Sequence, residues 1–294
     1  MTSTLPTPAA AATATLAAHP RLSLNQATIK YADLATALRV TADAGVTSIG
    51  LWREPVAEVG LETAVRMVAD SGLRVSSLCR GGFVTTPEGP ARRAAIDENR
   101  RAIAETAALG APTLVLVAGG LPEGSRDLVG ARERVRDAVG ELADEARAAG
   151  VTLAIEPLHP MYVSDRAVIS TLGQALDIAE QFGSDAVGVV VDTFHVWWDP
   201  ALAAQVARAG AGGYIASYQV CDWATPLPAD VLLARHYPGD GVIDFAGISE
   251  LVRTAGYAGD VEVEIFNQAI WDAPAAEVVA RTVASFGTAV APHL

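Results

Sequence analysis

Residues 187–198 read VGVVVDTFHVWW, an apolar run that ends in an aspartate and, three residues later, a histidine. A short run of this kind, rich in β-branched valine, is typical of a strand that is buried on both faces in a parallel sheet. Asp192 and His195 therefore fall where the predicted strand gives way to the following loop. In barrels of parallel strands, catalytic side chains project from this end of the strands. We expect a functional site there.

Similar short runs recur along the chain and alternate with amphipathic stretches of helical length. The candidate strands are residues 22–26, 46–51, 73–79, 113–118, 151–156, 187–192, 214–220 and 261–266. The candidate helices are residues 31–44, 61–71, 91–109, 128–149, 167–181, 200–209, 245–255 and 275–287. Glycine repeatedly follows a predicted helix, as in DAGV and AAGV.

Eight strand and helix units in strict order predict an α/β protein with one domain, a closed (β/α)8 TIM barrel over residues 21–294. An open doubly wound sheet is the alternative architecture. If it bound a dinucleotide, it would place a glycine-rich GxGxxG turn after its first strand. The segment SLNQAT, residues 23–28, has no such turn.

The composition excludes several classes of partner. Of the 294 residues, 51% are hydrophobic and 19% are charged. Charged residues and glycines interrupt the apolar runs too often for a membrane-spanning segment. A net charge of −13 disfavours nucleic acid and anionic membranes as partners. Two cysteines, Cys79 and Cys221, are too few for a disulfide framework. Residues 1–20 lack the features of a secretory signal, so we expect a flexible tail and a cytoplasmic protein.

The last four candidate strands each place one oxygen-bearing side chain at or near the strand end. These are Glu156, Asp192, Gln219 and Glu264. If the barrel closes, they meet on one rim, where three carboxylates would repel one another unless a cation neutralised them. An oxygen-only ligand set suits Mg²⁺ or Mn²⁺ better than Zn²⁺. The sequence therefore predicts a site for a divalent metal.

Glu262 does not fit this scheme, because strand alternation turns both Glu262 and Glu264 into the barrel. Three interpretations stay open for this further carboxylate. The Glu262 side chain could pair with a polar group in a lower layer of the barrel interior, it could be a neutral acid, or a β-bulge could turn it outward.

Several motifs together resemble the xylose isomerase-like sugar phosphate isomerase/epimerase superfamily. They are AIEP at 154–157, the DxxH of Asp192 and His195, CDW at 221–223, GDGVIDF at 239–245 and GYAGDVEVE at 256–264. The resemblance spans roughly residues 21–290. It implies that the four rim residues bind a divalent cation and that Glu156 and Glu264 act as acid and base on opposite sides of the substrate. Ketose epimerases commonly use histidine on strand seven, whereas hydroxypyruvate isomerase-like members resemble this chain in using glutamine.

The resemblance implies a metal-dependent isomerase or epimerase that acts on a keto-sugar or related hydroxy-carbonyl compound through an enediolate. Loss of a β-substituent from the same intermediate would make it a lyase, as in inosose dehydratase-like relatives and in subunits that cleave oxidised C-glycosides. A non-catalytic sugar-binding protein is the third alternative. An endonuclease is disfavoured by the acidic composition and the missing histidine ligands of a trinuclear zinc site. We expect a homo-oligomer, or a hetero-oligomer if the chain is a lyase subunit.

Side chains around the rim are candidates for contact with the substrate. For each of them, packing within the protein or a surface salt bridge is the competing interpretation. The candidates are His195, His159, Arg235, His236, Trp52 and Arg80.

Overall fold

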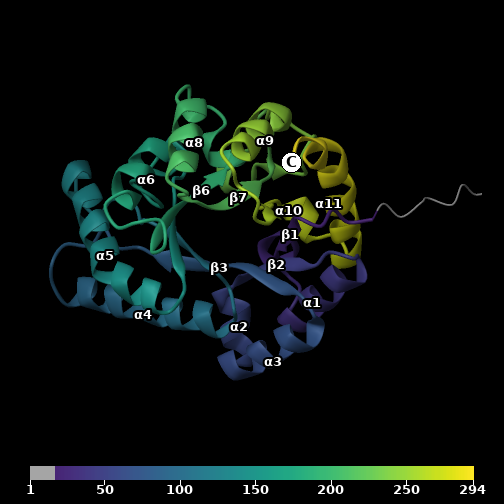
Figure 1. Cartoon of the computed structure of the whole chain (residues 1–294), viewed down its shortest axis with the longest axis horizontal. Helices are drawn as coiled ribbons and strands as arrows, with labels where there is room; N and C mark the ends of the chain where they lie inside the picture. The colour runs from purple at the N-terminus through teal and green to yellow at the C-terminus, as the bar shows by residue number, and fades with distance from the viewer. Residues whose placement is uncertain (1–16) are drawn as a thin grey trace, which may run out of the picture.

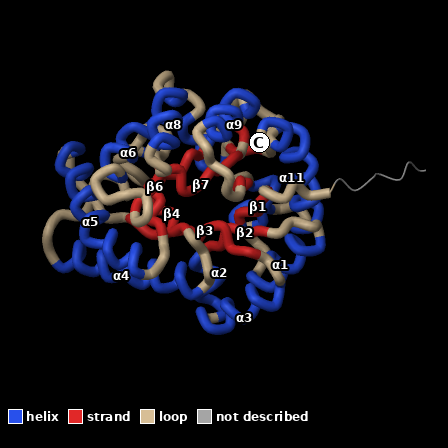
Figure 2. The backbone as a smooth tube through the Cα atoms, in the orientation of Figure 1, coloured by secondary structure: helices blue, strands red, loops and turns tan. Residues whose placement is uncertain are grey.

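A computed structural model describes residues 17–294, and eight parallel strands in it close into a barrel. The order around the barrel is β1-β10-β7-β6-β5-β4-β3-β2, with helices as an outer ring (Figures 1 and 2). The strands are β1 Leu22–Asn25, β2 Ser48–Trp52, β3 Arg74–Gly82, β4 Thr113–Val117, β5 Thr152–Glu156, β6 Val187–Asp192, β7 Ile215–Val220 and β10 Val261–Val263. The predicted single-domain TIM barrel is confirmed.

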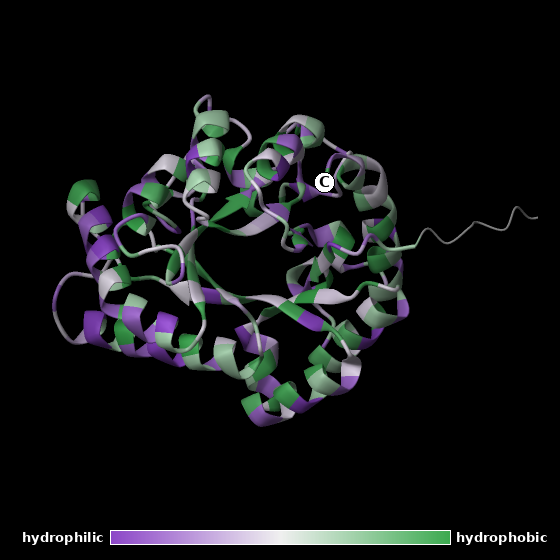
Figure 3. Ribbon diagram, viewed as in Figure 1, coloured by the Kyte–Doolittle hydropathy of each residue, from purple (hydrophilic) through white to green (hydrophobic). Residues whose placement is uncertain are grey.

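The main helices bury apolar residues against the barrel, and Figure 3 shows hydrophilic and hydrophobic residues mixed along the helices. They are α1 Leu34–Asp43, α2 Arg53–Val59, α3 Leu61–Ser71, α4 Pro90–Ala108, α5 Leu128–Ala148, α6 Leu172–Ala179, α8 Leu202–Ala211, α9 Phe245–Thr254 and α11 Ala275–Ala289. Glycine ends α3 and α5, where Gly72 and Gly150 have φ values of 71° and 70° that side chains disfavour. No helix among residues 17–294 is both long and apolar enough to cross a membrane.

The structure corrects several predicted boundaries. Strand β3 continues to Gly82, so Arg80 lies within this strand and not at its end. Helix α6 begins at Leu172 instead of residue 167, because the Thr171 hydroxyl accepts a hydrogen bond from the Gln174 N–H and caps the helix. Strand β10 ends at Val263, so Glu264 lies one residue beyond it.

The pattern did not predict short elements at the carboxyl ends of the strands. They are η1 Gln26–Ile29, η2 Pro160–Tyr162, α7 Thr193–Val196, β8 Asp222–Trp223, η3 Val231–Leu233, β9 Arg235–His236, α10 Gln268–Trp271 and, at the chain end, η4 Ala291–His293. Elements of two to four residues are too short to show a hydrophobic period. Strands β8 and β9 form a separate antiparallel pair.

The two ends of the barrel differ. At the amino-terminal ends of the strands, a cavity of about 660 Å³ is lined by a mixture of apolar, polar and charged side chains that include Val75, Ser76, Thr152 and Asp260. At the carboxyl ends, a cavity of about 200 Å³ is lined by Glu156, Glu264 and several basic and aromatic side chains. Because the predicted site residues follow the strands, the second cavity is the candidate site. Residues 1–16, most of the predicted tail, lie outside the described residues.

Candidate metal and acid/base site

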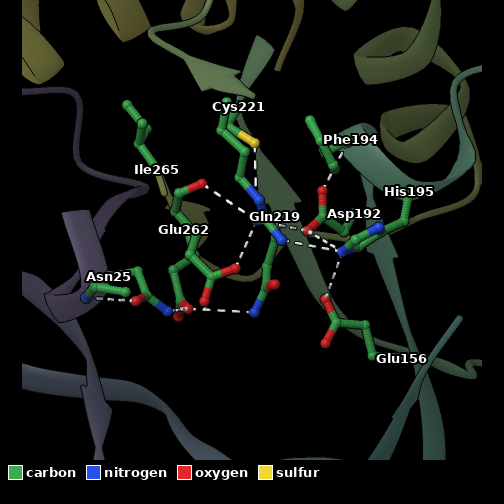
Figure 4. A network of polar contacts seen from close by, with 12 residues as sticks. Asn25, Glu156, Asp192, Phe194, His195, Gln219, Cys221, Glu262 and Ile265 are labelled. Atoms are coloured by element: carbon green, nitrogen blue, oxygen red, sulfur yellow. Dashed lines mark hydrogen bonds and ion pairs between the residues drawn. The ribbon is translucent and has the colours of Figure 1, made fainter. Parts of the chain in front are cut away.

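Three carboxylates are brought together at the carboxyl ends of β5, β6 and β10. Glu156 and Asp192 are the last residues of their strands, and Glu264 follows β10. Each is at most 4% exposed. His195 connects two of them, since its Nε2 lies 3.9 Å from Glu156 Oε1 and 3.8 Å from Asp192 Oδ2 (Figure 4).

Arg235 is the positive charge of this cluster. Its Nη1 donates to Glu264 Oε2 at 2.7 Å and to Asp192 Oδ2 at 3.3 Å. The guanidinium is 4% exposed and lies over the rings of Phe194 and Phe266. The surface salt bridge considered for Arg235 is therefore wrong, because β9 carries this residue into the barrel mouth.

One guanidinium leaves the cluster short of positive charge. With Glu156, Asp192 and Glu264 ionised, two negative charges stay uncompensated, which is costly in a buried site. Burial accordingly raises the pKa of Glu156 well above its ordinary value, and the charges of Glu264 and Asp192 add to this. Burial also raises the pKa of Glu264 to about 7, although Arg235 opposes the shift. The pKa of Asp192 is raised by burial, again against Arg235.

His195 is a neutral ring in this arrangement. Burial, assisted by Arg235, lowers its pKa well below the ordinary value. Its Nδ1 lies 3.1 Å from the backbone N–H of His159, and its Nε2 lies 3.0 Å from Arg235 Nη2, which can only donate. A neutral ring accepts at one nitrogen only, so these two contacts correspond to opposite tautomers. The ligand atoms of Glu156, Asp192 and His195 lie within 4.8 Å of one another.

Gln219 fits the missing cation. It pairs in register with Asp192 on β6 and with Glu262 on β10, so it lies between the two acids. Its Nε2 donates to Glu262 Oε1 at 3.2 Å, whereas its buried Oε1 has no hydrogen-bond partner (Figure 4). An unpartnered amide oxygen beside carboxylates is a donor set for a hard divalent cation. Glu156 and Asp192 lie in the cluster with His195, whereas Arg235 Nη1 lies between Asp192 and Glu264, so Gln219 and Glu264 stay predicted ligands.

Glu262 lies inside the barrel and pairs with polar side chains, the first of the three interpretations left open by the sequence. Its carboxylate accepts hydrogen bonds from Asn25 Nδ2 at 2.6 Å, Ser76 Oγ at 2.6 Å and Ser77 Oγ at 2.9 Å, besides the bond from Gln219. Burial raises the pKa of Glu262, while these donors oppose the shift. Gly50 provides the room, because a Cβ there would lie 2.5 Å from the Glu262 carboxyl.

The GDGVIDF segment holds the Arg235 hairpin in place. The buried Asp222 carboxylate accepts hydrogen bonds from the backbone N–H groups of Gly239, Gly241 and Ile243 at 2.8–3.0 Å. A Cβ on Gly241 would lie 2.3 Å from the Trp223 carbonyl oxygen, so glycine is needed for this close approach. The motif therefore organises the loop that carries Arg235 on β9.

The predicted substrate contacts divide into two groups. Trp52, Arg80, His195 and Arg235 line the 200 Å³ cavity. The His159 ring instead packs against Trp198 and Trp223, and burial lowers its pKa. Neither His159 nor His236 is among the residues that line this cavity.

Other cavity residues were missed by the sequence reasoning. They are Lys30, Cys79, Phe83, Val117, Leu158, Tyr162, Arg166, Leu232 and Phe266. Lys30 carried a usable signal, because it is the only lysine in a sequence with 21 basic residues. Cys79 and Val117 lie in predicted strands but are apolar, and the remaining residues come from segments without a periodic pattern.

The fold and the rim of buried acids define a barrel of the sugar isomerase and epimerase kind. The chain belongs to the xylose isomerase-like TIM barrel family, whose model matches residues 38–286. Protein SMc04130 from Sinorhizobium meliloti 1021 is 49% identical in sequence to this chain. Its crystal structure superposes with a TM-score of 0.89 and covers 92% of this chain and 98% of that one. The structure of the IOLI protein with a bound zinc atom has a TM-score of 0.81 at 21% identity, covering 93% and 99%, and shows likeness of fold alone.

Characterised relatives match shorter stretches. L-ribulose 3-epimerase of Mesorhizobium japonicum is 31% identical over 137 residues, which is 46% of this chain and 41% of the relative. A 3-dehydroshikimate dehydratase of Pseudomonas aeruginosa is 30% identical over 168 residues, which is 55% of this chain and 24% of the relative. The chain thus matches less than half the length of either relative. It is related to sugar epimerases and isomerases and also to dehydratases.

Proposed function

We propose that the protein is a divalent-metal-dependent isomerase or epimerase of a keto-sugar or related hydroxy-carbonyl compound. The observation that carries the proposal is the buried cluster of Glu156, Asp192 and Glu264 with Arg235 as its one guanidinium. Mn²⁺ or Mg²⁺, held by these acids and Gln219, would supply the missing charge and polarise the substrate carbonyl. The relation to L-ribulose 3-epimerase supports the type of reaction.

Glu156 and Glu264 are the proposed proton carriers. Both line the cavity, so their carboxyl groups are accessible to a small molecule in it although they are nearly buried. One carboxylate removes the proton beside the carbonyl, and the other returns a proton to a different position or face.

Arg235 and His195 are the proposed donors to the substrate. Arg235 Nη2 and His195 Nε2 lie 3.0 Å apart, and both side chains line the cavity. A substrate oxygen that accepts from Arg235 Nη2 would replace the contact with His195 Nε2, and the ring protonated at Nε2 would then donate to the same oxygen. Such donors stabilise the negative charge that develops on this oxygen as the carbon-bound proton leaves.

The proposal is tested by metal analysis together with solvent deuterium exchange. The wild-type protein loaded with Mn²⁺ should bind the ion stoichiometrically and incorporate deuterium at a carbon beside the carbonyl in a panel of ketoses and inososes. Glu156→Gln and Glu264→Gln should each slow exchange by about 10²-fold or more. The proposal would be overturned if the protein bound neither Mn²⁺ nor Mg²⁺ and incorporated no deuterium into any compound of the panel.

A lyase that uses the same acids is the second candidate, and the match to a 3-dehydroshikimate dehydratase favours it. In this reaction one carboxylate removes the proton and the other protonates the leaving group on the neighbouring carbon. Analysis of the products separates the two candidates, because a lyase releases water or an aglycone and forms an unsaturated product, whereas an isomerase or epimerase does neither. A partner subunit would then be a further expectation.

A further inference from the structure

We propose that the substrate carries a negatively charged group, a carboxylate or a phosphate, besides its hydroxy-carbonyl group. The inference deepens the proposed function and rests on it, because it concerns the substrate of the same cavity. It is drawn from the distribution of charge around the 200 Å³ cavity at the carboxyl ends of the strands.

Basic side chains from four separate segments line this cavity. Lys30 follows η1, Arg80 lies in β3, Arg166 follows η2, and Arg235 lies in β9. Arg235 is already paired with Asp192 and Glu264. The other three cations are therefore the groups whose purpose the metal and proton chemistry does not explain.

These three cations are not neutralised by the protein. Among residues 17–294, neither Lys30 nor Arg80 forms an ion pair with a carboxylate. Arg166 has only a distant partner, with its Nε 3.9 Å from Asp165 Oδ2. The sequence holds 34 acidic residues against 21 basic ones, so carboxylates are abundant. Leaving cations unpaired at one cavity of such an acidic protein points to an external anion.

Aromatic rings hold the three cations at the cavity instead. Lys30 Nζ lies 4.4 Å from the centroid of the Trp271 ring, and Arg80 Cζ lies 4.3 Å from that of Phe83. Arg166 Cζ lies 5.8 Å from the centroid of the Tyr162 ring. The face of an aromatic ring attracts a cation without cancelling its charge. The side chains are thereby restrained while their full charge stays available to a ligand.

The depths of the two kinds of charge orient the substrate. Glu156 and Glu264 are buried, whereas Lys30 is exposed and Arg80 and Arg166 are half-buried. A substrate with its hydroxy-carbonyl end toward the two glutamates places its anionic group among the outer cations. The reverse orientation would bring the anion against two carboxylates, which repel it.

Three probes that share a hydroxyketone test the inference with the Mn²⁺-loaded protein. They are dihydroxyacetone, which is neutral, dihydroxyacetone phosphate and hydroxypyruvate. Their dissociation constants are measured by calorimetry at two ionic strengths. At least one anionic probe should bind about tenfold or more tightly than dihydroxyacetone, and added salt should weaken this preference. The tighter of the two anions identifies the charged group as phosphate or carboxylate.

Variants assign the preference to the cations at the mouth. Arg80→Met and Lys30→Met should each reduce the binding of the preferred anion several-fold and leave dihydroxyacetone binding unchanged. Arg93→Met is the matched control, because Arg93 is exposed, forms no ion pair among residues 17–294 and does not line the cavity, so it removes the same charge elsewhere. Since Lys30 is the only lysine, reductive ¹³C-methylation labels one side chain, whose NMR signal should shift when the anion is added.

Two results would overturn the inference. Anionic probes that bind no better than dihydroxyacetone would remove the charge preference, and a preference insensitive to Arg80→Met and Lys30→Met would remove its assignment. If the inference fails in this way while deuterium exchange with a neutral ketose is observed, the proposed function stands. If Mn²⁺ is not bound, the same titrations are made with the metal-free protein. An anion preference that is lost in the variants then shows that the anion site stands while the proposed function fails.

Discussion

Glu262 and Gln219 form a contact whose effect reaches the proposed metal site. The Gln219 amide offers either a nitrogen or an oxygen toward the acids, and only the oxygen can bind a cation. By accepting a hydrogen bond from Nε2, Glu262 holds the amide in the orientation that leaves Oε1 unpartnered. Glu262 is therefore a positioning residue in this interpretation, and it is itself held by Asn25, Ser76 and Ser77.

Replacing Glu262 should thus alter metal affinity through Gln219. Glu262→Leu removes the acceptor and should weaken Mn²⁺ binding by about 10- to 100-fold, the usual effect of losing a residue that orients a metal ligand. Glu262→Gln retains an oxygen that can accept from Gln219, so it should restore most of the affinity. Calorimetric titration of the metal-free proteins with Mn²⁺ measures both effects.

Asp260→Leu is the control for this pair of variants. Asp260 lies two residues earlier and contacts Ser48 and Arg74, not Gln219. Equal losses of affinity in Glu262→Leu and Asp260→Leu would contradict the positioning role. If Glu262 acts through Gln219, the losses of Mn²⁺ affinity in Glu262→Leu and Gln219→Leu should not add in the double variant. Additive losses would also contradict the positioning role.

At the scale of elements, the hairpin of β8 and β9 connects a sequence motif to the site. Asp222 begins the hairpin and binds the backbone of the GDGVIDF segment, while Arg235 on the opposite strand enters the barrel mouth. The strands supply the acids, but this short hairpin supplies their counter-charge. Its stability therefore governs the electrostatics of the cluster.

Asp222→Ala should destabilise this element. The change leaves several backbone N–H groups near the protein interior without an acceptor, so we expect the free energy of unfolding to fall by about 2–3 kcal/mol. Urea denaturation measures the loss. Asp240→Ala in the same segment removes only an exposed pair with Arg281 and should cost less than about 1 kcal/mol. Similar losses for both variants would show that Asp222 does not organise the loop.

At the scale of the whole molecule, the buried acids connect stability to pH and metal. A carboxyl group whose pKa is raised by folding stabilises the folded state while protonated, below its unfolded value, and this contribution is lost as the pH rises through the folded value. For Glu264 the change runs from the ordinary 4.5 to about 7. Glu156 and Asp192 shift in the same direction.

In EDTA, the melting temperature should therefore fall as the pH rises from about 5 to about 8. Mn²⁺ should reverse this fall, because an ion that binds only the folded protein adds about 2.7 kcal/mol at a hundred times its dissociation constant. Scanning calorimetry across this pH range with and without Mn²⁺ measures both effects. Glu264→Gln should flatten the slope in EDTA, and an unchanged slope in this variant would refute the assignment.

The sequence by itself determined the barrel and the rim. Valine-rich runs that alternate with amphipathic helices allow few other folds, and parallel strands bring their carboxyl ends to one edge. Glu156, Asp192 and Glu264 could therefore be placed together from their positions at strand ends. The tertiary structure decided what lies between them. Arg235 and Asp192 are 43 residues apart, as are Glu262 and Gln219, and such contacts depend on strand register and on a short hairpin that no local pattern specifies.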